Sequence, residues 1–374
     1  MEIIFSIFIS PSYAGLMLWL LYGIFKLKPF QLQQEEQKTS FTICIPFRNE
    51  AENLPRLIAS LKTIDYSTEL FEIIFIDDCS EDHSAKIVEE FIQQNKQLSI
   101  QLLENSAKAI SPKKEALSKA IKASTKKYIV TTDADCIVPQ KWLQYFNAMV
   151  IKEQSDFIAG PVSYLSKKSF LDKFQSLDFL SLQAATLGGF GNKKPFLCNG
   201  ANLCYRKKTF IELSGFENDK IASGDDIFML EKMKFAQKKI DYLSHHEAQV
   251  KTLPPQNLKA LFQQRVRWAA KTSAYKNPTS LLTAIVVFLA NLGFMVFALG
   301  AILKLITWQA FLILFVVKFN IDFLILYNTA AFYQNLHLLK NYVIIAFLHP
   351  IFVTSTAMQS FLTSYEWKGR TYHK

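Results

Sequence analysis

Two kinds of hydrophobic pattern divide the chain. Nearly unbroken apolar runs lie near both ends, at residues 3–25, 281–306, 308–327 and 342–361. Each is about as long as a helix that crosses a bilayer. Between them, short apolar runs alternate with amphipathic stretches. The pattern therefore predicts a water-soluble middle flanked by membrane-spanning helices.

The middle of the chain predicts an α/β domain. Short apolar runs at residues 41–46, 71–76, 100–103 and 128–132 indicate buried strands. Helical stretches separate them, one of which has Asp82 as its expected N-cap. Strands and helices that alternate at this spacing predict a doubly wound, mostly parallel sheet. Ligands of such sheets bind beyond the carboxyl ends of the strands.

A less regular part of the chain follows the fourth strand. Residues 170–187 predict a helix with a wide apolar face, which either packs on the sheet or lies on a membrane surface. We expect Gly188–Gly191 to form a flexible loop. Cys198–Asn202 predicts a turn of small residues where a ligand could approach the backbone.

The apolar ends predict a membrane topology. Residues 3–25 lack a basic leader and a cleavage site, which favours a retained anchor. Lys26 and Lys28 follow directly, so the positive-inside rule places the N-terminus outside and the next segment in the cytoplasm. With three further spans the basic tail would lie outside, so one C-terminal segment is expected to be re-entrant or interfacial. Lys318 and Asp322, four residues apart, are expected to pair within the membrane.

These patterns predict four parts. They are an anchor at residues 1–28, a cytoplasmic domain at 40–275, a membrane region of about three helices at 280–366, and a basic tail at 367–374. The protein would then be a multi-pass protein of the cell membrane.

Composition narrows the choice of partners. The 42 Lys and Arg exceed the 32 Asp and Glu, giving a net charge of +10. Such an excess suits a phosphate-bearing ligand or an anionic membrane face, although a merely basic soluble protein has it too. The five Cys show no metal-ligand spacing, which indicates reduced residues of a cytoplasmic core. The chain has no GxGxxG and no P-loop motif, so a dinucleotide oxidoreductase or a P-loop enzyme is unsupported.

Acidic pairs follow two of the predicted strands. Asp77 and Asp78 follow the second, and Asp133 and Asp135 follow the fourth. Neighbouring carboxylates repel each other unless a positive charge lies near them. A hard divalent cation carrying phosphate oxygens would supply that charge, whereas the alternative is a polar turn that closes a strand.

Two further motifs are candidates for chemistry. Asp225 and Asp226 open a helix, and N-capping accounts for only one of them. Gln264, Arg267 and Trp268 fall within one turn of a later basic helix. An arginine there suits a diphosphate, although an Arg/Trp belt beside a membrane is the plainer explanation.

Taken together, these motifs resemble those of the membrane-bound family 2 glycosyltransferases. Ceramide glucosyltransferase and the catalytic core of cellulose and hyaluronan synthases have a similar arrangement. The resemblance covers about residues 41–268 and implies a GT-A-type doubly wound mixed sheet flanked by transmembrane helices. It implies that the nucleotide sugar contacts Pro46, Arg48, Glu50, Asp77, Asp78, Lys113, Lys114, Asp133, Gln264, Arg267 and Trp268.

One motif departs from the family pattern. Ser111–Leu117 stands where the family has Gly-Lys followed by Ala-Leu, and Pro112 takes the place of the glycine. Which of Lys113 and Lys114 meets the nucleotide therefore stays open.

The resemblance also implies a mechanism. Asp135, with Asp133 nearby, would hold Mg²⁺ or Mn²⁺ at the diphosphate, where Arg267 adds a fixed positive charge. A carboxylate must accept the proton of the attacking hydroxyl, and by resemblance it is Asp226, with Asp225 as the second choice. Direct displacement with one base implies inversion at the anomeric carbon. Trp268 would border the acceptor pocket.

The expected function is transfer of a sugar from a nucleotide-diphosphate sugar, with a UDP-sugar as the expected donor, to a lipid or lipid-linked acceptor. The alternative is a processive synthase of the cellulose, hyaluronan or poly-N-acetylglucosamine type, for which about three C-terminal spans make a dedicated polymer channel hard to build. A non-enzymatic receptor or transporter subunit gives no reason for carboxylates at successive strand ends. We expect membrane lipids and a lipid or glycan acceptor as partners, and no nucleic acid.

Overall fold

The chain folds into two compact units. The computed structural model describes residues 2–33, 36–106, 111–165, 169–217, 224–362, 365–367 and 370–372. One unit, called the sheet unit here, comprises Lys28–Leu165 and Cys198–Leu253. The other, called the helical unit, comprises Met1–Leu27, Ser166–Leu197 and Pro254–Lys374. The helical unit is thus assembled from three separate stretches of the chain.

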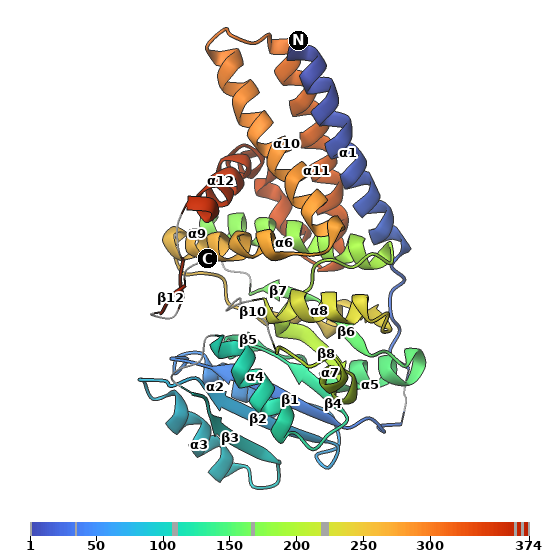
Figure 1. The fold of residues 1–374 in the computed structure, drawn as a ribbon, viewed down its shortest axis with the longest axis vertical. Coiled ribbons are helices and arrows are strands. Elements are labelled where there is room, and N and C mark those ends of the chain that lie inside the picture. Colours follow the sequence, from blue (N-terminus) through green and yellow to red (C-terminus); the bar gives the residue numbers. More distant parts are fainter. Residues whose placement is uncertain are drawn as a thin grey trace. The chain divides into compact units, whose positions relative to one another are not determined.

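The larger sheet of the sheet unit has, among the described residues, seven strands in the order β3-β2-β1-β4-β8-β6-β9 (Figure 1). Its first four strands run parallel and confirm the four strands predicted from the apolar runs. They are β1 (Phe41–Phe47), β2 (Phe71–Asp77), β3 (Ile100–Glu104) and β4 (Tyr128–Thr131). Every residue of β2 and of β4 is buried, as expected for strands that are covered on both faces.

The remaining strands make the sheet mixed, as expected. The strand β8 (Leu203–Arg206) runs antiparallel to β4 on one side and to β6 (Phe157–Ala159) on the other. The edge strand β9 (Ile240–Tyr242) pairs with β6 in parallel. A second sheet joins three short strands, in the order β5 (Cys136–Ile137), β10 (Val250–Thr252) and β7 (Val162–Tyr164).

The helices of the sheet unit connect these strands. They are α2 (Leu54–Leu61), α3 (Ser84–Gln94), α4 (Pro112–Ala123), α5 (Trp142–Glu153), α7 (Lys207–Glu212) and α8 (Asp225–Phe235). The predicted N-cap at Asp82 is wrong, because α3 starts one residue later, with His83 in the capping position. Asp82 instead accepts hydrogen bonds from the backbone N–H groups of Ala51 and Ser84, which join the loops after β1 and β2.

Long helices make up the helical unit. Here α1 (Glu2–Lys26), α10 (Pro278–Ile302) and α11 (Trp308–Phe332) run side by side, and α6 (Phe170–Gly191) and α9 (Leu258–Ala270) lie across one end of them (Figure 1). The last helix, α12 (Tyr342–Leu362), packs mainly on α9 and α10, and a short hairpin of β11 (Tyr365–Trp367) and β12 (Arg370–Tyr372) follows it.

Three helical segments in the described part of the chain have the length and the apolar character to span a membrane. Among the described residues, Pro278–Ile302, Trp308–Phe332 and Leu336–Leu362 are long and apolar enough to cross a bilayer. The predicted pairing within the second of them is confirmed, since Lys318 Nζ lies 2.5 Å from Asp322 Oδ2. Tyr13 of α1 donates its hydroxyl to the same carboxylate, so the pair also joins α11 to α1.

The loop expected at Gly188–Gly191 is wrong, because these residues form the last turn of α6. The physical reason is a close crossing with α1. A Cβ atom built on Gly23 would lie 2.0 Å from the carbonyl oxygen of Gly188, and one on Gly191 would lie 1.8 Å from that of Gly23. Only glycines let the two backbones approach this closely. Thus α6 packs on α1 and α11 within the helical unit.

Candidate active site

A lysine links two of the predicted acidic motifs. Lys113 lies in the first turn of α4, which Pro112 opens because its fixed φ suits that position. Its Nζ lies 2.7 Å from Asp133 Oδ1 and 3.4 Å from Asp225 Oδ2. Burial lowers the pKa of Lys113, but Asp133 and Asp225 outweigh that effect and raise the pKa above its ordinary value. Lys113 therefore carries its charge at neutral pH.

Asp225 and Asp226 occupy the first turn of α8. The expectation that one of them caps this helix is wrong, because the capping position is held by Gly224 and no side chain caps it. Gly224 has a φ of +87°, a conformation that favours glycine. Both carboxylates lie at the helix N-terminus, where the exposed N–H groups and the helix dipole favour negative charge. Asp225 is buried, whereas Asp226 is partly exposed.

The small-residue turn at Cys198–Asn202 lies directly against this pair. The N–H of Gly200 donates to Asp226 Oδ2 at 3.2 Å. A Cβ atom on Gly200 would lie 3.0 Å from Asp225 Oδ2 and 3.6 Å from Lys113 Nζ. The sequence pattern indicated that a ligand could approach the backbone here. In the structure, the backbone N–H of Gly200 binds Asp226, one residue of the acidic pair.

Asn202 fixes that turn, and sequence reasoning missed its role. Its side chain is fully buried. The carbonyl oxygen accepts from Trp142 Nε1 at 2.9 Å, and Nδ2 donates to the carbonyls of Pro161 and Ala248. Thr131 at the end of β4 donates to the carbonyl of Gly200 at 2.7 Å. The sequence feature that could have indicated this role is the amide side chain of Asn202, directly before the apolar residues of β8.

Asp133 and Asp135 lie in the turn between β4 and β5, because β4 ends at Thr131. They therefore belong to a turn that follows the strand and not to the strand itself. Ala134 between them is buried and both acids are partly exposed, so the two carboxylates still share the more accessible side.

This turn fits a hard divalent cation. Within the parts of the chain that the structure describes, no group of three or more His, Cys, Asp or Glu is arranged to hold a metal ion. One or two carboxylates with substrate phosphates is, however, the ligand set that Mg²⁺ commonly takes in nucleotide sites. Asp133 and Asp135 supply two carboxylates of that kind.

The first two strand ends form a second polar cluster. Asp78 Oδ1 accepts from Asn105 Nδ2 at 2.8 Å, and Asp77 Oδ1 accepts from the N–H of Ser80 at 2.9 Å. Arg48 donates to the backbone carbonyls of Asp78 and Cys79, both at 2.8 Å. The loops after β1, β2 and β3 are thus held together where parallel strands commonly bind nucleotides.

Other predicted residues lie at the edges of these clusters. Pro46 belongs to β1, and Glu50 accepts a hydrogen bond from Asn53 Nδ2 at 2.6 Å. Lys114 is buried, with its Nζ 4.5 Å from the ring centroid of Phe228 on α8. Of the two lysines that the sequence left open, Lys113 is thus the one held between Asp133 and Asp225.

The segment Gln264–Trp268, called the QRVRW stretch here after its sequence, belongs to the helical unit. Gln264, Arg267 and Trp268 are on α9, which belongs to the helical unit, whereas the other predicted site residues belong to the sheet unit. The predicted residues are thus divided between the two units. Within the sheet unit, the structure brings together Lys113, Asp133, Asp225 and Asp226 around Gly200.

Two family models match the chain. The family described as Glycosyl transferase family 2 matches residues 42–213. The one described as Glycosyl transferase family group 2 matches residues 128–351, which is more than half of the chain.

Curated relatives include poly-beta-1,6-N-acetyl-D-glucosamine synthases. The protein of Staphylococcus aureus (strain COL) is 27% identical over 255 residues, which cover 66% of this chain and 57% of the relative. That of Staphylococcus epidermidis is 25% identical over 259 residues, covering 66% and 59%. The chain thus matches less than two thirds of the length of these relatives.

Among solved structures, the mannosyltransferase PcManGT from Pyrobaculum calidifontis, in complex with GDP-Man and Mn²⁺, has a similar fold. Its TM-score is 0.62 at 16% identity, and the match covers 94% of this chain and 99% of that one. The fold, the order of the motifs and the match over more than half of the sequence all agree. The chain belongs to the family 2 glycosyltransferases.

Proposed function

We propose that this protein transfers a sugar, with inversion, from a nucleotide-diphosphate sugar to a hydroxyl of a lipid or glycan acceptor. The observation that carries the proposal is the position of Lys113 between Asp133 and Asp225. One charged lysine there joins the motif expected to hold the diphosphate to the motif expected to hold the base. The reaction needs the diphosphate-binding group and the base close together. The leaving diphosphate and the attacking hydroxyl are both bound to one anomeric carbon in the transition state, on its two opposite faces.

The leaving group is a diphosphate, whose negative charge grows as the sugar departs. Lys113 supplies a fixed positive charge for it, and its raised pKa keeps that charge at neutral pH. Asp77, Asp78 and Arg48 border the strand ends at which the nucleotide would be bound. Mg²⁺ or Mn²⁺, held by Asp135 with Asp133, would neutralise further charge on the diphosphate.

The attacking hydroxyl must lose its proton as the new bond forms. Asp226 is the better placed of the two candidate bases, because it is partly exposed and accepts a hydrogen bond from the neutral N–H of Gly200. Asp225 is buried and its Oδ2 lies 3.4 Å from the Nζ of Lys113, so this carboxylate is already engaged by the lysine. We therefore assign Asp226 as the base and Asp225 as a residue that fixes Lys113.

A processive polysaccharide synthase is the second candidate function. The 27% identity to a poly-beta-1,6-N-acetyl-D-glucosamine synthase favours it, and would make UDP-N-acetylglucosamine the donor to test first. The three helices of membrane-spanning length among the described residues favour transfer of one or a few sugars to a lipid-linked acceptor instead. In both cases we propose that the sheet unit faces the cytoplasm, where nucleotide sugars are made.

The test is transfer by the purified full-length protein in lipid nanodiscs, with a panel of radiolabelled nucleotide sugars and Mg²⁺ or Mn²⁺. A single glycolipid product supports limited transfer, and a ladder or polymer supports the synthase. Chelation of divalent cations should stop either reaction, whereas an unaffected rate would remove the metal role of Asp135. Lack of transfer from every donor, by protein that still binds nucleotide diphosphates, would contradict the proposed function.

A further inference from the structure

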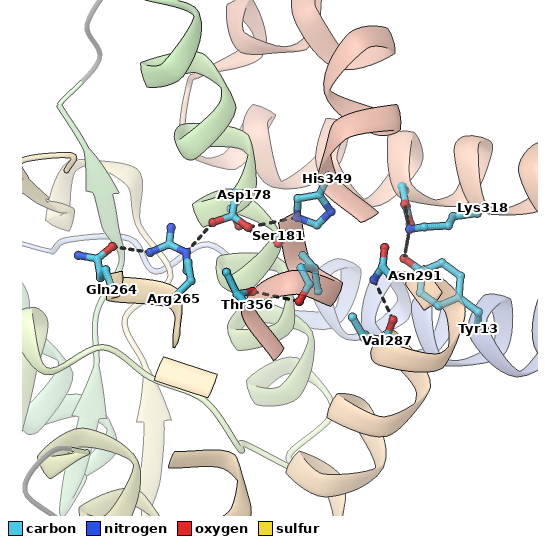
Figure 2. A network of polar contacts seen from close by, with 12 residues as sticks. Tyr13, Asp178, Ser181, Gln264, Arg265, Val287, Asn291, Lys318, His349 and Thr356 are labelled. Carbon is cyan, nitrogen blue, oxygen red and sulfur yellow. Dashed lines mark hydrogen bonds and ion pairs between the residues drawn. The ribbon is translucent and has the colours of Figure 1, made fainter. Parts of the chain in front are cut away.

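Arg265, inside the QRVRW stretch, contacts two of the motif's other residues. Its guanidinium donates to Gln264 Oε1 (Figure 2). The same group lies over Trp268, with Cζ 4.2 Å from the ring centroid. Planar guanidinium groups stack well on aromatic rings. Gln264 and Trp268, one helical turn apart, are therefore both held by the residue between them.

Arg265 is in turn held by an acid on another helix. Its Nε lies 2.6 Å from Asp178 Oδ2 on α6, and the two side chains are only 7% and 6% exposed. The other oxygen of Asp178 lies 3.1 Å from His349 Nε2 on α12 (Figure 2). Burial alone would raise the pKa of Asp178, but Arg265 and His349 outweigh it and lower the pKa to about 2. Asp178 is thus an ionised carboxylate shared by three helices.

Apolar contacts also join these helices. Phe352 on α12 packs edge-on against both Phe174 on α6 and Phe262 on α9. Apolar contacts of this kind stabilise a helix interface, but they specify a single arrangement less strictly than a fully satisfied polar contact does. A buried ion pair adds little net stability, since both charges lose their water, but it is satisfied in one geometry only. We therefore expect the charged contact, more than the apolar ones, to determine how α9 is rotated on α6.

We propose that Asp178 is a positioning residue that, through Arg265, fixes how Gln264 and Trp268 are presented for the acceptor. This inference rests on the proposed function, and on the family resemblance, which implies that Trp268 borders the acceptor pocket. Asp178 acts on the motif through its ion pair with Arg265, not by touching the substrate. The ligand most affected is the acceptor, because Arg265 stacks on Trp268, which the resemblance places at the acceptor pocket, whereas the charge on the diphosphate is expected from Arg267.

The experiment compares four full-length proteins in nanodiscs: wild type, Asp178→Asn, Arg265→Met and the double variant. Each single variant leaves one buried charge without its counter-charge and should melt at a lower temperature. The double variant removes both charges, so its melting temperature should recover towards that of wild type. Its acceptor KM should nevertheless stay raised, by about tenfold, because Gln264 and Trp268 have lost their contact. Its affinity for the nucleotide diphosphate should change by less than about twofold.

A matched control separates positioning from general disorder. Asp322→Asn breaks another ion pair of the same unit, on α11, in which Lys318 is 5% and Asp322 20% exposed, and it should lower the melting temperature without raising the acceptor KM. Hydrogen exchange of peptides covering residues 258–270 gives a readout that does not need activity. Exchange there should be faster in the double variant and unchanged in Asp322→Asn.

Two results would overturn the inference. One is a double variant with wild-type acceptor KM and wild-type exchange in α9. The other is an Asp322→Asn protein that shows the same rise in acceptor KM. A wild-type protein that transfers no sugar would instead contradict the proposed function, while the exchange data would still decide whether Asp178 and Arg265 order α9.

Discussion

Lys113 and Asp225 lie 3.4 Å apart although they come from helices more than a hundred residues apart in the sequence. This contact brings the start of α4 to the start of α8 and leaves Asp226 on the more accessible side of the pair. Asp225 and Asp226 therefore have different environments. Carboxylates in different environments can serve different roles in one active site, as we propose for these two.

Replacement of the proposed base tests that assignment. Asp226→Asn should lower kcat by roughly 10²–10⁴-fold, because the amide cannot accept the hydroxyl proton. Nucleotide-diphosphate affinity, measured by calorimetry, should change little. Asp225→Asn is the matched variant and should weaken nucleotide binding more than Asp226→Asn does, because Lys113 loses a partner. Near wild-type turnover by Asp226→Asn would show that another group is the base.

Lys113 should not govern the pH dependence of donor binding. Its pKa is raised in the folded protein, so its charge is fully present below its ordinary pKa and is lost only at still higher pH. Lys113→Met should weaken donor binding roughly tenfold, about 1.4 kcal/mol, at every pH from 6 to 9. Lys113→Arg keeps the charge and is the control. A wild-type affinity that falls with a midpoint inside this range, and is flat in Lys113→Arg, would contradict the expectation.

The crossing of α1 and α6 should tolerate no side chain. Gly23→Ala places a Cβ atom against the backbone of Gly188, which cannot move aside as a side-chain end could. The protein should lose about 1–3 kcal/mol or more of stability, seen as a lower melting temperature in nanodiscs. A Cβ atom on Gly15 of the same helix would meet nothing within 4 Å, so Gly15→Ala should be neutral or stabilising. Equal melting temperatures for the two variants would argue against the crossing.

The ion pair of α11 should behave as a buried one. Lys318 is only 5% exposed, so Lys318→Met leaves the charge of Asp322 uncompensated and should destabilise the protein by about 3–5 kcal/mol. Lys318→Met/Asp322→Leu removes both charges and should be less destabilised than the single variant. Thermal unfolding of both proteins checks this order, and the reverse order would mean that the pair is solvated.

The last long helix should begin and end on the same side of the membrane. The segment before it, Leu336–Asn341, contacts α6, and β11 after it contacts α9. Both α6 and α9 lie across the same end of the other helices (Figure 1). This favours the re-entrant or interfacial segment that the basic tail suggested.

Cysteine labelling in sealed vesicles checks that topology, in a Cys79→Ser background because the other native cysteines are buried. Leu362→Cys should react from the same side as Leu258→Cys, at the start of α9, and from the opposite side to Leu305→Cys, between α10 and α11. All three leucines are well exposed. Labelling of Leu362→Cys together with Leu305→Cys would mean that the helix crosses.

The features that depend on the local sequence pattern could be predicted from the sequence. The strands β1 to β4 follow from their apolar runs, and Lys318 and Asp322 pair because they are one helical turn apart. All five cysteines are free in the structure, and four of them are buried, as expected for core residues.

What the sequence missed depends on partners far away in the chain. Glycines usually mark a loop, and only the approach of Gly23 explains why Gly188 is helical. Asp178 and Arg265 are 87 residues apart, and no periodicity relates them. Likewise, no local signal shows that Gly200 lies under Asp226, since the turn and the helix meet only when β8 pairs with β4. The roles of the site residues stay predictions.

The contact between Tyr13 and Asp322 has a consequence for biosynthesis. The two residues are 309 positions apart. At ordinary rates of translation the ribosome needs on the order of 15–60 s to pass from one to the other. During synthesis, α1 therefore stays without its contacts to α11 until the whole sheet unit has been translated. Lys318 and Asp322, in contrast, are one helical turn apart and are translated almost together. Their charges can therefore pair before α11 enters the bilayer, and the hydroxyl of Tyr13 can bind Asp322 afterwards.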